Sequence, residues 1–371
     1  MRAATASVFM ALVALSMLSV GCSSKALKKV GGDNAMPSEL PDDIKEKFTV
    51  KDISELKTGQ PGISAGWQLP APQASAQPIS GVAAKKKSKK KANRKDAKGP
   101  ATVQTPAAAF QTPEAAPANL QARPEHKGYP SRRPAKDPIW VGEKLTYDVS
   151  YFGVVAGIFD LEVLPFKVIN NRKVYHVRGE ARSSKIFSLF YRMSDWVESF
   201  IDYEGFFSHR LHLVLDETKQ MRDSLELNDS DKGKTFYWNR WNRHDRGYTE
   251  VKEYVDAPKF AQDTLSLVFY VRTVPLPDGA VITVPVISES KNWEAVITVV
   301  RREEMSTPLG KIRTVVLKPE MKYQGVLKKQ GDSFVWLSDD DRRFLVKLDA
   351  KVRIGSILAT LKKVRHGAPS Q

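Results

Sequence analysis

Hydrophobic and polar side chains alternate along short stretches of the chain between residues 139 and 365. Residues 144–152 place hydrophobic side chains at every second position, and residues 159–163 and 195–201 repeat this spacing. Because successive side chains of a β-strand point to opposite faces, the spacing predicts strands with one buried and one solvated face. The same alternation or a β-branched run recurs at residues 174–177, 207–215, 222–227, 235–238, 281–286, 293–300, 312–317, 334–337, 344–348 and 357–361.

The links between these stretches are short and rich in turn residues, as at residues 170–171 and 229–233. Links of this kind favour antiparallel hairpins over crossover helices. Two stretches have helical spacing instead, residues 184–192 and residues 256–272, and Asp263 is the expected cap of the second. The sequence therefore predicts a mainly β fold: a large curved antiparallel sheet resembling a half-barrel, with one or two helices and one concave face.

The part of the chain before this domain has a different composition. Fourteen of the 22 prolines lie between residues 23 and 138, among many Ala, Gln and Ser residues and without a sustained hydrophobic period. Such a segment cannot bury enough apolar surface to offset the entropy of ordering it, so we predict a disordered tether over residues 22–138. Within the tether, residues 41–56 have the spacing of a marginal helix. The β-rich domain then spans residues 139–365, and residues 366–371 form a tail.

Residues 1–21 have the pattern of a secretory signal peptide: one charge at Arg2, an apolar core and small residues before Cys22. Cys22 is the single cysteine, which excludes a disulfide within one chain. Its position resembles the lipobox of bacterial lipoproteins, and this resemblance implies that Cys22 is acylated. Ser23 then implies export to the outer membrane, facing the periplasm. The alternative is an ordinary signal and a soluble periplasmic protein.

The formal net charge of +16 is concentrated in one segment. Residues 85–98 contain nine basic side chains and one acidic one, which leaves little excess charge for the β-rich domain. Clustered lysines bind phosphates, but this run lacks the aromatic residues of single-strand binders, so we expect no nucleic-acid partner. We expect either a solvated spacer or binding to anionic lipid or cell wall. The candidate residues for this anionic surface are Lys85, Lys86, Lys87, Lys89, Lys90, Lys91, Arg94, Lys95 and Lys98.

No catalytic motif stands out in the β-rich domain. It has no thiol, no Gly-x-Ser-x-Gly elbow and no phosphate or dinucleotide loop, and we predict neither enzyme activity nor a cofactor nor a metal site. His209 and His212 are three residues apart in a predicted strand and therefore face opposite ways. The aromatic side chains are the remaining candidates. They form either an ordinary core or an apolar ligand face, for which we name Trp196, Phe200, Trp293 and Trp336.

Several short motifs of this domain match a known family. They are Gly142-Glu143-x-Leu-x-Tyr147, the DWVES block at Asp195, Asp263-Thr-Leu-Ser266 and the Trp-Leu-Ser-Asp-Asp block at Trp336. In these motifs residues 139–363 resemble the bacterial envelope family called domain of unknown function 3108. The resemblance implies an exported, often lipid-anchored β-rich protein without an assigned activity. More loosely, the domain is similar to periplasmic half-barrel lipoprotein carriers, which hold acyl chains.

We therefore expect a non-enzymatic outer-membrane lipoprotein whose periplasmic β-domain binds a lipid, a glycolipid or another apolar ligand. The alternative is an envelope scaffold whose basic tether binds cell wall or anionic lipid while the β-domain engages another protein.

Overall fold

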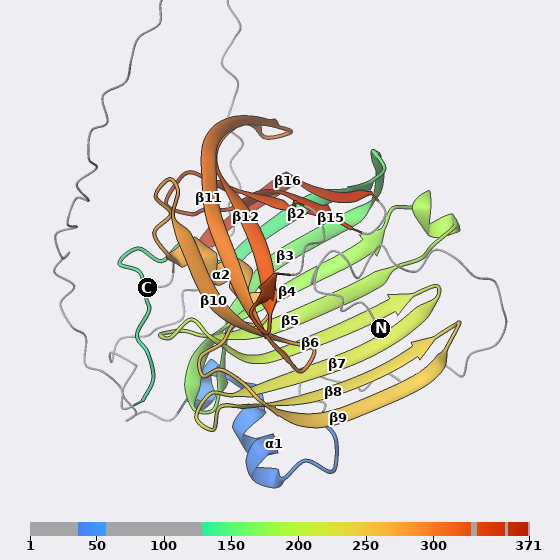
Figure 1. Ribbon diagram of the computed structural model, residues 1–371, viewed down its shortest axis with the longest axis vertical. Coiled ribbons are helices and arrows are strands. Elements are labelled where there is room, and N and C mark those ends of the chain that lie inside the picture. Colours follow the sequence, from blue (N-terminus) through green and yellow to red (C-terminus); the bar gives the residue numbers. More distant parts are fainter. Residues whose placement is uncertain (1–35, 57–127, 328–331, 353–354, 370–371) are drawn as a thin grey trace, which may run out of the picture. The chain divides into compact units, whose positions relative to one another are not determined.

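A computed structural model describes residues 36–56, 128–327, 332–352 and 355–369 (Figure 1). All of these belong to one compact unit formed by residues 1–63 and 124–371. Within the described residues, sixteen strands join a single antiparallel sheet, which confirms the predicted fold class. The whole predicted signal peptide and most of the predicted tether, including Cys22 and the basic run, lie outside the described residues.

The strands follow the alternating stretches of the sequence closely. Their bounds are β1 (Lys51–Asp52), β2 (Val141–Tyr151), β3 (Val154–Ile169), β4 (Arg172–Ser183), β5 (Ser194–Asp202), β6 (Ser208–Glu217), β7 (Gln220–Asp229), β8 (Lys234–Arg243), β9 (Gly247–Asp256), β10 (Val281–Ser288), β11 (Lys291–Thr307), β12 (Gly310–Tyr323), β13 (Val326–Leu327), β14 (Phe334–Ser338), β15 (Leu345–Lys351) and β16 (Ser356–Ala368). The helices are α1 (Asp42–Phe48) and α2 (Ser266–Thr273), with 3-10 turns η2 (Ile53–Glu55) and η3 (Phe187–Leu189).

Neighbours in the sheet are mostly neighbours in the chain. The order is β10-β11-β12-β14-β15-β16-β2-β3-β4-β5-β6-β7-β8-β9, with β1 paired to β3 and β13 to β12. The two ends of the domain therefore meet in the interior of the sheet, where β2 pairs with β16. Its edges, β9 and β10, are consecutive strands joined through α2. A parallel bridge between Gln262 and Val286 ties this connection to the β10 edge.

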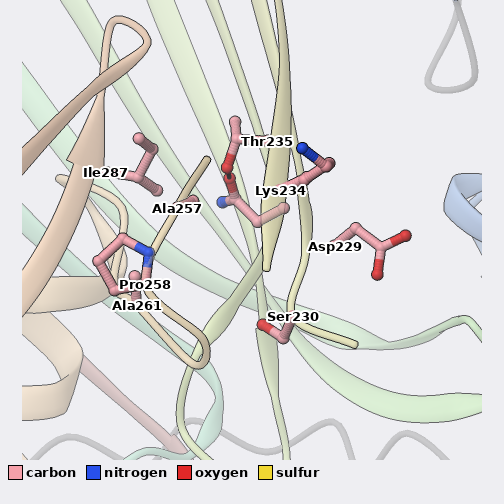
Figure 2. A pocket seen from close by; sticks show the side chains of 9 residues that line it. Asp229, Ser230, Lys234, Thr235, Ala257, Pro258, Ala261 and Ile287 are labelled. Carbon is pink, nitrogen blue, oxygen red and sulfur yellow. Dashed lines mark hydrogen bonds between the residues drawn. The ribbon is translucent and has the colours of Figure 1, made fainter. Parts of the chain in front are cut away.

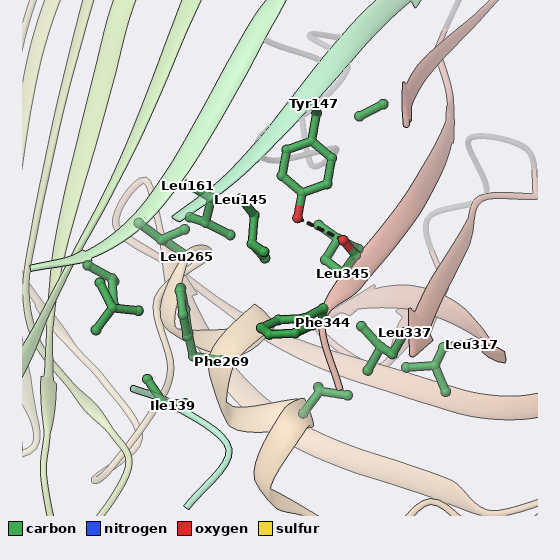
Figure 3. Close-up of a cluster of buried hydrophobic side chains, with 14 of the residues drawn as sticks. Ile139, Leu145, Tyr147, Leu161, Leu265, Phe269, Leu317, Leu337, Phe344 and Leu345 are labelled. Carbon is green, nitrogen blue, oxygen red and sulfur yellow. Dashed lines mark hydrogen bonds between the residues drawn. The ribbon is translucent and has the colours of Figure 1, made fainter. Parts of the chain in front are cut away.

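The large hydrophobic core lies on the face of the sheet that contacts α2, which we call the inner face. Leu265 and Phe269 of the α2 segment are buried there against side chains from β11 through β16 and from β2 to β6. Figure 3 shows Phe269 among residues of this cluster. The buried hydroxyl of Tyr147 donates to the Leu345 carbonyl oxygen at 2.8 Å. The one polar atom that this ring brings into the core is therefore paired.

Helix α2 is shorter than the stretch with helical spacing. Asp263 accepts hydrogen bonds from the backbone N–H groups of Leu265 and Ser266, as expected of a residue that caps a helix start. The preceding residues 257–262 are not helical: the Ala257 N–H donates to the Gly233 carbonyl oxygen, and Gln262 exchanges backbone hydrogen bonds with Pro285 and Ile287 of the β10 edge. The stretch 184–192, also helical in spacing, contains only the 3-10 turn η3.

Residues 36–50, which the composition places within the tether, pack on the opposite, outer face of the sheet. Ile44 and Phe48 lie four residues apart and form the buried side of α1, and Leu40, just before the helix, is buried with them. They contact Phe200 and hydrophobic side chains of β7 and β8. The helical spacing of residues 41–56 thus corresponds to α1, whose few spaced apolar residues pack on a complementary surface of the sheet.

Candidate functional site

The register of the strands assigns each side chain to one face. Residues directly opposite each other in an antiparallel pair lie on the same side of the sheet. One such row on the inner face is Val197, Leu213, Ser224, Asn239 and Val251, from β5 to β9. Along this row the side chains change from hydrophobic to polar between β6 and β7. We call the inner face from β11 through β16 and β2 to β6 the apolar region. The inner face of β7–β9, together with the adjoining Asp195 and Glu217, is the polar region.

Arg222 of β7 is the centre of the polar region. Its guanidinium, which is almost fully buried, donates to Asn239 at 2.7 Å, to the Tyr237 hydroxyl at 2.9 Å and to Glu289 at 2.9 Å. Glu289 comes from the β10–β11 turn, so the charge on β7 is neutralised from the other edge of the sheet. A buried guanidinium is tolerated only when its donors are paired in this way.

Trp241 extends this network toward the exposed edge of the sheet. Its ring lies 4.9 Å from the Arg222 guanidinium and 4.1 Å from that of Arg243, and its indole N–H donates to Gln220 at 2.9 Å. Two cations against the ring and one hydrogen bond on its edge fix the indole in place. Trp241 is half-buried, and Val251 on the neighbouring strand is exposed, so this part of the inner face is accessible from β9.

The β10–β11 turn reaches the polar region through a strained backbone. Glu289 and Ser290 both have positive φ, 51° and 58°, in a two-residue turn that usually contains Asn or Gly. The Glu289 N–H donates to the Glu226 carboxylate at 2.6 Å. Burial raises the pKa of Glu226 to about 8, so this carboxyl is protonated at neutral pH. Its second oxygen is buried without a partner among the described residues.

A pair of carboxyl groups lies at the other end of the polar region. Burial, and then the nearby carboxylate of Glu217, raise the pKa of Asp195 well above its usual value. Burial also raises the pKa of Glu217, although Tyr191 and Gln220 donate hydrogen bonds to it. Two buried acids this close hold one proton between them at neutral pH. The polar region can thus both donate and accept hydrogen bonds while carrying little net negative charge.

Neither histidine of β6 belongs to this network. His209 lies 3.0 Å from Asp202, and His212 lies 2.9 Å from Asp223. Glu198, on the outer face, accepts from Arg178 at 2.6 Å. Burial opposes its ionisation, but the His176 ring 3.4 Å away and the hydrogen bond from Arg178 lower its pKa to about 2. Asp195 and Glu198 therefore face opposite sides, as their spacing in a strand predicts.

The structure does not bring the four candidate residues of the apolar ligand face together. Trp196 lies half-buried on the outer face beside His212, and Phe200 is fully buried under α1. Trp293 packs with Val284 and other residues of β10 and β11 in a separate cluster. Trp336 packs with Val316 and Val346 in a third cluster, with its indole N–H on Glu303. They take part in separate packing clusters, and the described residues form no common surface from them.

Two of the motifs that carried the family resemblance, the one with Glu143 and the block from Trp336 to Asp340, meet beside a buried ion-pair cluster. Glu143 accepts two hydrogen bonds from Arg272 of α2, at 2.6 and 2.8 Å, and one from Arg342 at 2.6 Å. Asp340 accepts from the backbone N–H groups of Arg342 and Arg343 and so shapes the turn between β14 and β15. These residues join the start of β2, α2 and this turn, and their arrangement is structural.

The hollow shown in Figure 2 is small and partly polar. Its empty space, part of which is open solvent, measures about 180 Å³ and lies between Asn228, Thr235, Ala257, Pro258 and Ile287. Sites for drug-sized ligands usually measure about 300–1,000 Å³. This hollow is therefore too small for a lipid, and we take the polar region as the candidate site.

Sequence reasoning missed Arg222, Glu226 and Trp241. The signal available in the sequence was their spacing. Arg222 and Glu226 are four residues apart and therefore lie on one face of a strand, and Tyr237 and Trp241 have the same spacing in the next strand. Within the described ranges, no three His, Cys, Asp or Glu residues are grouped to hold a metal ion. No helix in those ranges has the length and hydropathy needed to span a bilayer.

Three kinds of comparison relate the chain to known proteins. A family model described as "Protein of unknown function (DUF3108)" matches residues 146–362. No curated protein matches. Among solved structures, a β-barrel-like DUF1849 protein from Brucella abortus is 10% identical, covers 61% of this chain and 97% of its own, and has a TM-score of 0.37.

Two further structures are similarly distant. A Bacteroides fragilis protein with a YmcC-like fold, provisionally described as exported, is 10% identical, with 62% of this chain and 98% of its own covered and a TM-score of 0.29. A Parabacteroides distasonis protein provisionally described as a lipoprotein is 6% identical, with 64% and 100% covered and a TM-score of 0.28.

Proposed function

The chain belongs to the DUF3108 family of proteins of unknown function, and from that premise we propose that it is a non-catalytic binding protein of the bacterial cell envelope. Its ligand is an amphipathic molecule, a lipid or glycolipid, held on the inner face of the sheet. The signal peptide and Cys22 support an outer-membrane lipoprotein that faces the periplasm. The β-domain then meets lipid-derived molecules in the compartment where it works.

The observation that carries the proposal is the change of chemistry along the inner face. The row from Val197 and Leu213 to Ser224 and Asn239 passes from hydrophobic to polar side chains within a few strands. An acyl chain gains free energy on the first part of such a row, and a polar headgroup finds hydrogen-bond partners on the second. Val251 and Trp241 lie at the accessible side, where the headgroup would enter.

The protonation states favour an uncharged or sugar headgroup. Glu226 is neutral at pH 7, Arg222 is already paired with Glu289, and the Asp195–Glu217 pair holds a proton. Hydroxyl groups can exchange hydrogen bonds with such a set without bringing in an unpaired charge.

Native mass spectrometry of the full chain carrying Cys22→Ser, extracted mildly, tests the proposal. We expect a co-purifying lipid mass and uptake of a fluorescent glycolipid by the emptied protein. Val251→Asp, on the inner face of β9, should weaken uptake about tenfold because it places a charge at the entry. Tyr248→Asp is the matched control, since Tyr248 is also exposed but lies on the outer face of the same strand. A consistently empty protein without uptake contradicts the proposal.

The basic tether supports a second candidate function, an envelope scaffold. Its nine cations attract cell-wall carboxylates or anionic lipid. Deleting residues 85–98 should abolish salt-sensitive binding of the full chain to isolated sacculi. Unchanged pull-down would remove this role and leave the glycolipid experiment unaffected.

A further inference from the structure

Two neighbouring turns at one end of the sheet expose large hydrophobic side chains. One is the turn between β2 and β3, and the other is the segment between β4 and β5 that contains η3. Six large hydrophobic side chains in these turns are between 46% and 81% exposed. The surface of a soluble protein seldom has so many exposed hydrophobic side chains next to one another. We call the following residues the apolar end: Phe152, Val154, Val155, Ile186, Leu189 and Phe190.

The two turns form one continuous surface. The Ser184 N–H donates to the Ala156 carbonyl oxygen at 2.8 Å, and Gly157 lies opposite Ser183 at the adjoining ends of β3 and β4. The η3 segment is anchored at its base, because the Ser183 hydroxyl donates to the Tyr191 carbonyl at 2.8 Å and Tyr191 is buried. An ordered base therefore presents the exposed side chains.

Folding alone does not explain why residue 152 is a phenylalanine. It has a φ of 48°, a left-handed conformation that a bulky side chain rarely adopts, in a turn completed by Gly153. Its ring contacts the neighbouring Tyr151, with centroids 4.4 Å apart, yet Phe152 remains 67% exposed. Packing on Tyr151 does not explain a phenylalanine at a position where Asn or Gly would fit without strain.

Cations without carboxylate partners surround the apolar end. Lys185 lies within the η3 segment, and Lys219 is in a turn joined to that segment by the Thr218 N–H, which donates to the Arg192 carbonyl. Lys351 precedes Gly355, which lies against the Phe152 ring. None of the three lysines forms an ion pair with a carboxylate anywhere in the part of the chain that the structure describes.

We propose that the apolar end inserts into the interface of an anionic phospholipid membrane, with its hydrophobic side chains among the acyl chains and its lysines at the headgroups. Exposed hydrophobic side chains gain free energy when they are buried among acyl chains. The lysines around them are attracted to the anionic headgroups of the same membrane. This docking site is distinct from the inner-face ligand site and from the anchor at Cys22. It holds the sheet against a bilayer by the end that carries η3.

Vesicle binding tests the proposal in the full chain. All variants are made in a full chain that carries Cys22→Ser and has the nine basic residues of residues 85–98 replaced by glutamine. Neither the acyl anchor nor the tether then binds lipid. We expect this protein to cosediment with vesicles of phosphatidylcholine and phosphatidylglycerol, more weakly with phosphatidylcholine alone or at high salt. Leu189→Ser with Phe190→Ser should weaken binding by about tenfold or more. Val281→Ser with Val326→Ser, two exposed valines elsewhere on the sheet, should not.

Two single substitutions separate insertion from a folding defect. Phe152→Gly removes the backbone strain, so it should leave the unfolding midpoint unchanged or higher while it weakens vesicle binding. Phe190→Trp should add blue-shifted emission that brominated lipid quenches, and Val281→Trp should not. Unchanged binding of the Leu189/Phe190 variant overturns the proposal, as does emission from the Phe190→Trp variant that stays solvent-exposed on bound vesicles. The proposal is also overturned if these substitutions abolish the binding of another protein while binding to vesicles stays intact.

Discussion

At Val197 and Leu213 the inner face packs into a hydrophobic core, whereas the next two strands continue the same row with Ser224 and Asn239. The apolar region is filled by the chain itself, since α2 places Leu265 and Phe269 on it. The polar region has no helix among the described residues and is held by Arg222, Glu226 and the β10–β11 turn. One sheet thus supports a region whose side chains pack into a hydrophobic core and a region whose buried side chains form a hydrogen-bonded polar network.

The strongest test of this contrast is Phe269→Ala. Phe269 is completely buried in the apolar region, so we expect the free energy of unfolding to fall by about 4 kcal/mol from lost burial and the cavity left behind. Urea denaturation measures the change. Tyr248→Ala, at an exposed site, serves as the control and should cost little. An effect below that of the control would mean that α2 does not support the core.

The buried ion pair between Glu143 and Arg272 gives the next largest effect. Glu143→Leu leaves the guanidinium of Arg272 buried without its carboxylate, and we expect a loss of about 3 kcal/mol. Adding Arg272→Met to Glu143→Leu should recover most of that loss, because two apolar side chains need no partner. If the double variant is no more stable than the single one, the bond from Arg272 to the Pro138 carbonyl matters more than the ion pair.

The two faces should respond oppositely to pH. The pKa of Glu226 is raised from 4.5 to about 8, so its folded state binds the proton more tightly, and its contribution is lost as the pH rises through 8. The pKa of Glu198 on the outer face is lowered to about 2, so its contribution is lost as the pH falls from 4.5 through 2. Glu226→Gln should therefore flatten the decline in unfolding free energy between pH 5 and 8, by about 3 kcal/mol. An unchanged slope would contradict the neutral state of Glu226; Glu198→Gln is the control and should alter the acid side alone.

The smallest effect concerns the β10–β11 turn, which contacts the polar region. Ser290→Gly removes a positive-φ strain. Among the described residues the Ser290 hydroxyl donates to the adjacent Glu289 carbonyl alone, so we expect a gain of about 0.5–1 kcal/mol. Glu289→Gly relieves the same kind of strain but takes the carboxylate away from Arg222, so it should destabilise the protein. Thermal unfolding of the two variants shows the opposite signs. Equal shifts would mean that the Arg222 network contributes nothing.

Local pattern predicted the sheet well because each strand keeps its alternation. Residues 222–227 show where that reasoning ends: Ser224 and Glu226 alternate with Leu225 and Leu227 and so belong to a predicted solvated face. The structure buries both faces, since α1 covers the leucines and the β10–β11 turn, sixty residues further along the chain, reaches Glu226. Contacts at that sequence distance leave no local pattern. The helical spacing of residues 184–192 likewise did not reveal that Ile186, Leu189 and Phe190 would be exposed.

The pairing of β2 with β16 has a consequence for how the protein matures. Val141 lies opposite Ala368, so the first long strand of the domain gains one of its two neighbours only when the last strand arrives. Contacts this far apart in sequence slow folding, because the loop entropy is lost before the contact forms. Until β16 is complete, the hairpin of β2 and β3 therefore has an unpaired edge in the middle of the future sheet. A chain truncated before Ser356 would lose the centre of the sheet, and we expect proteases and chaperones to act on this protein chiefly in that incompletely folded state.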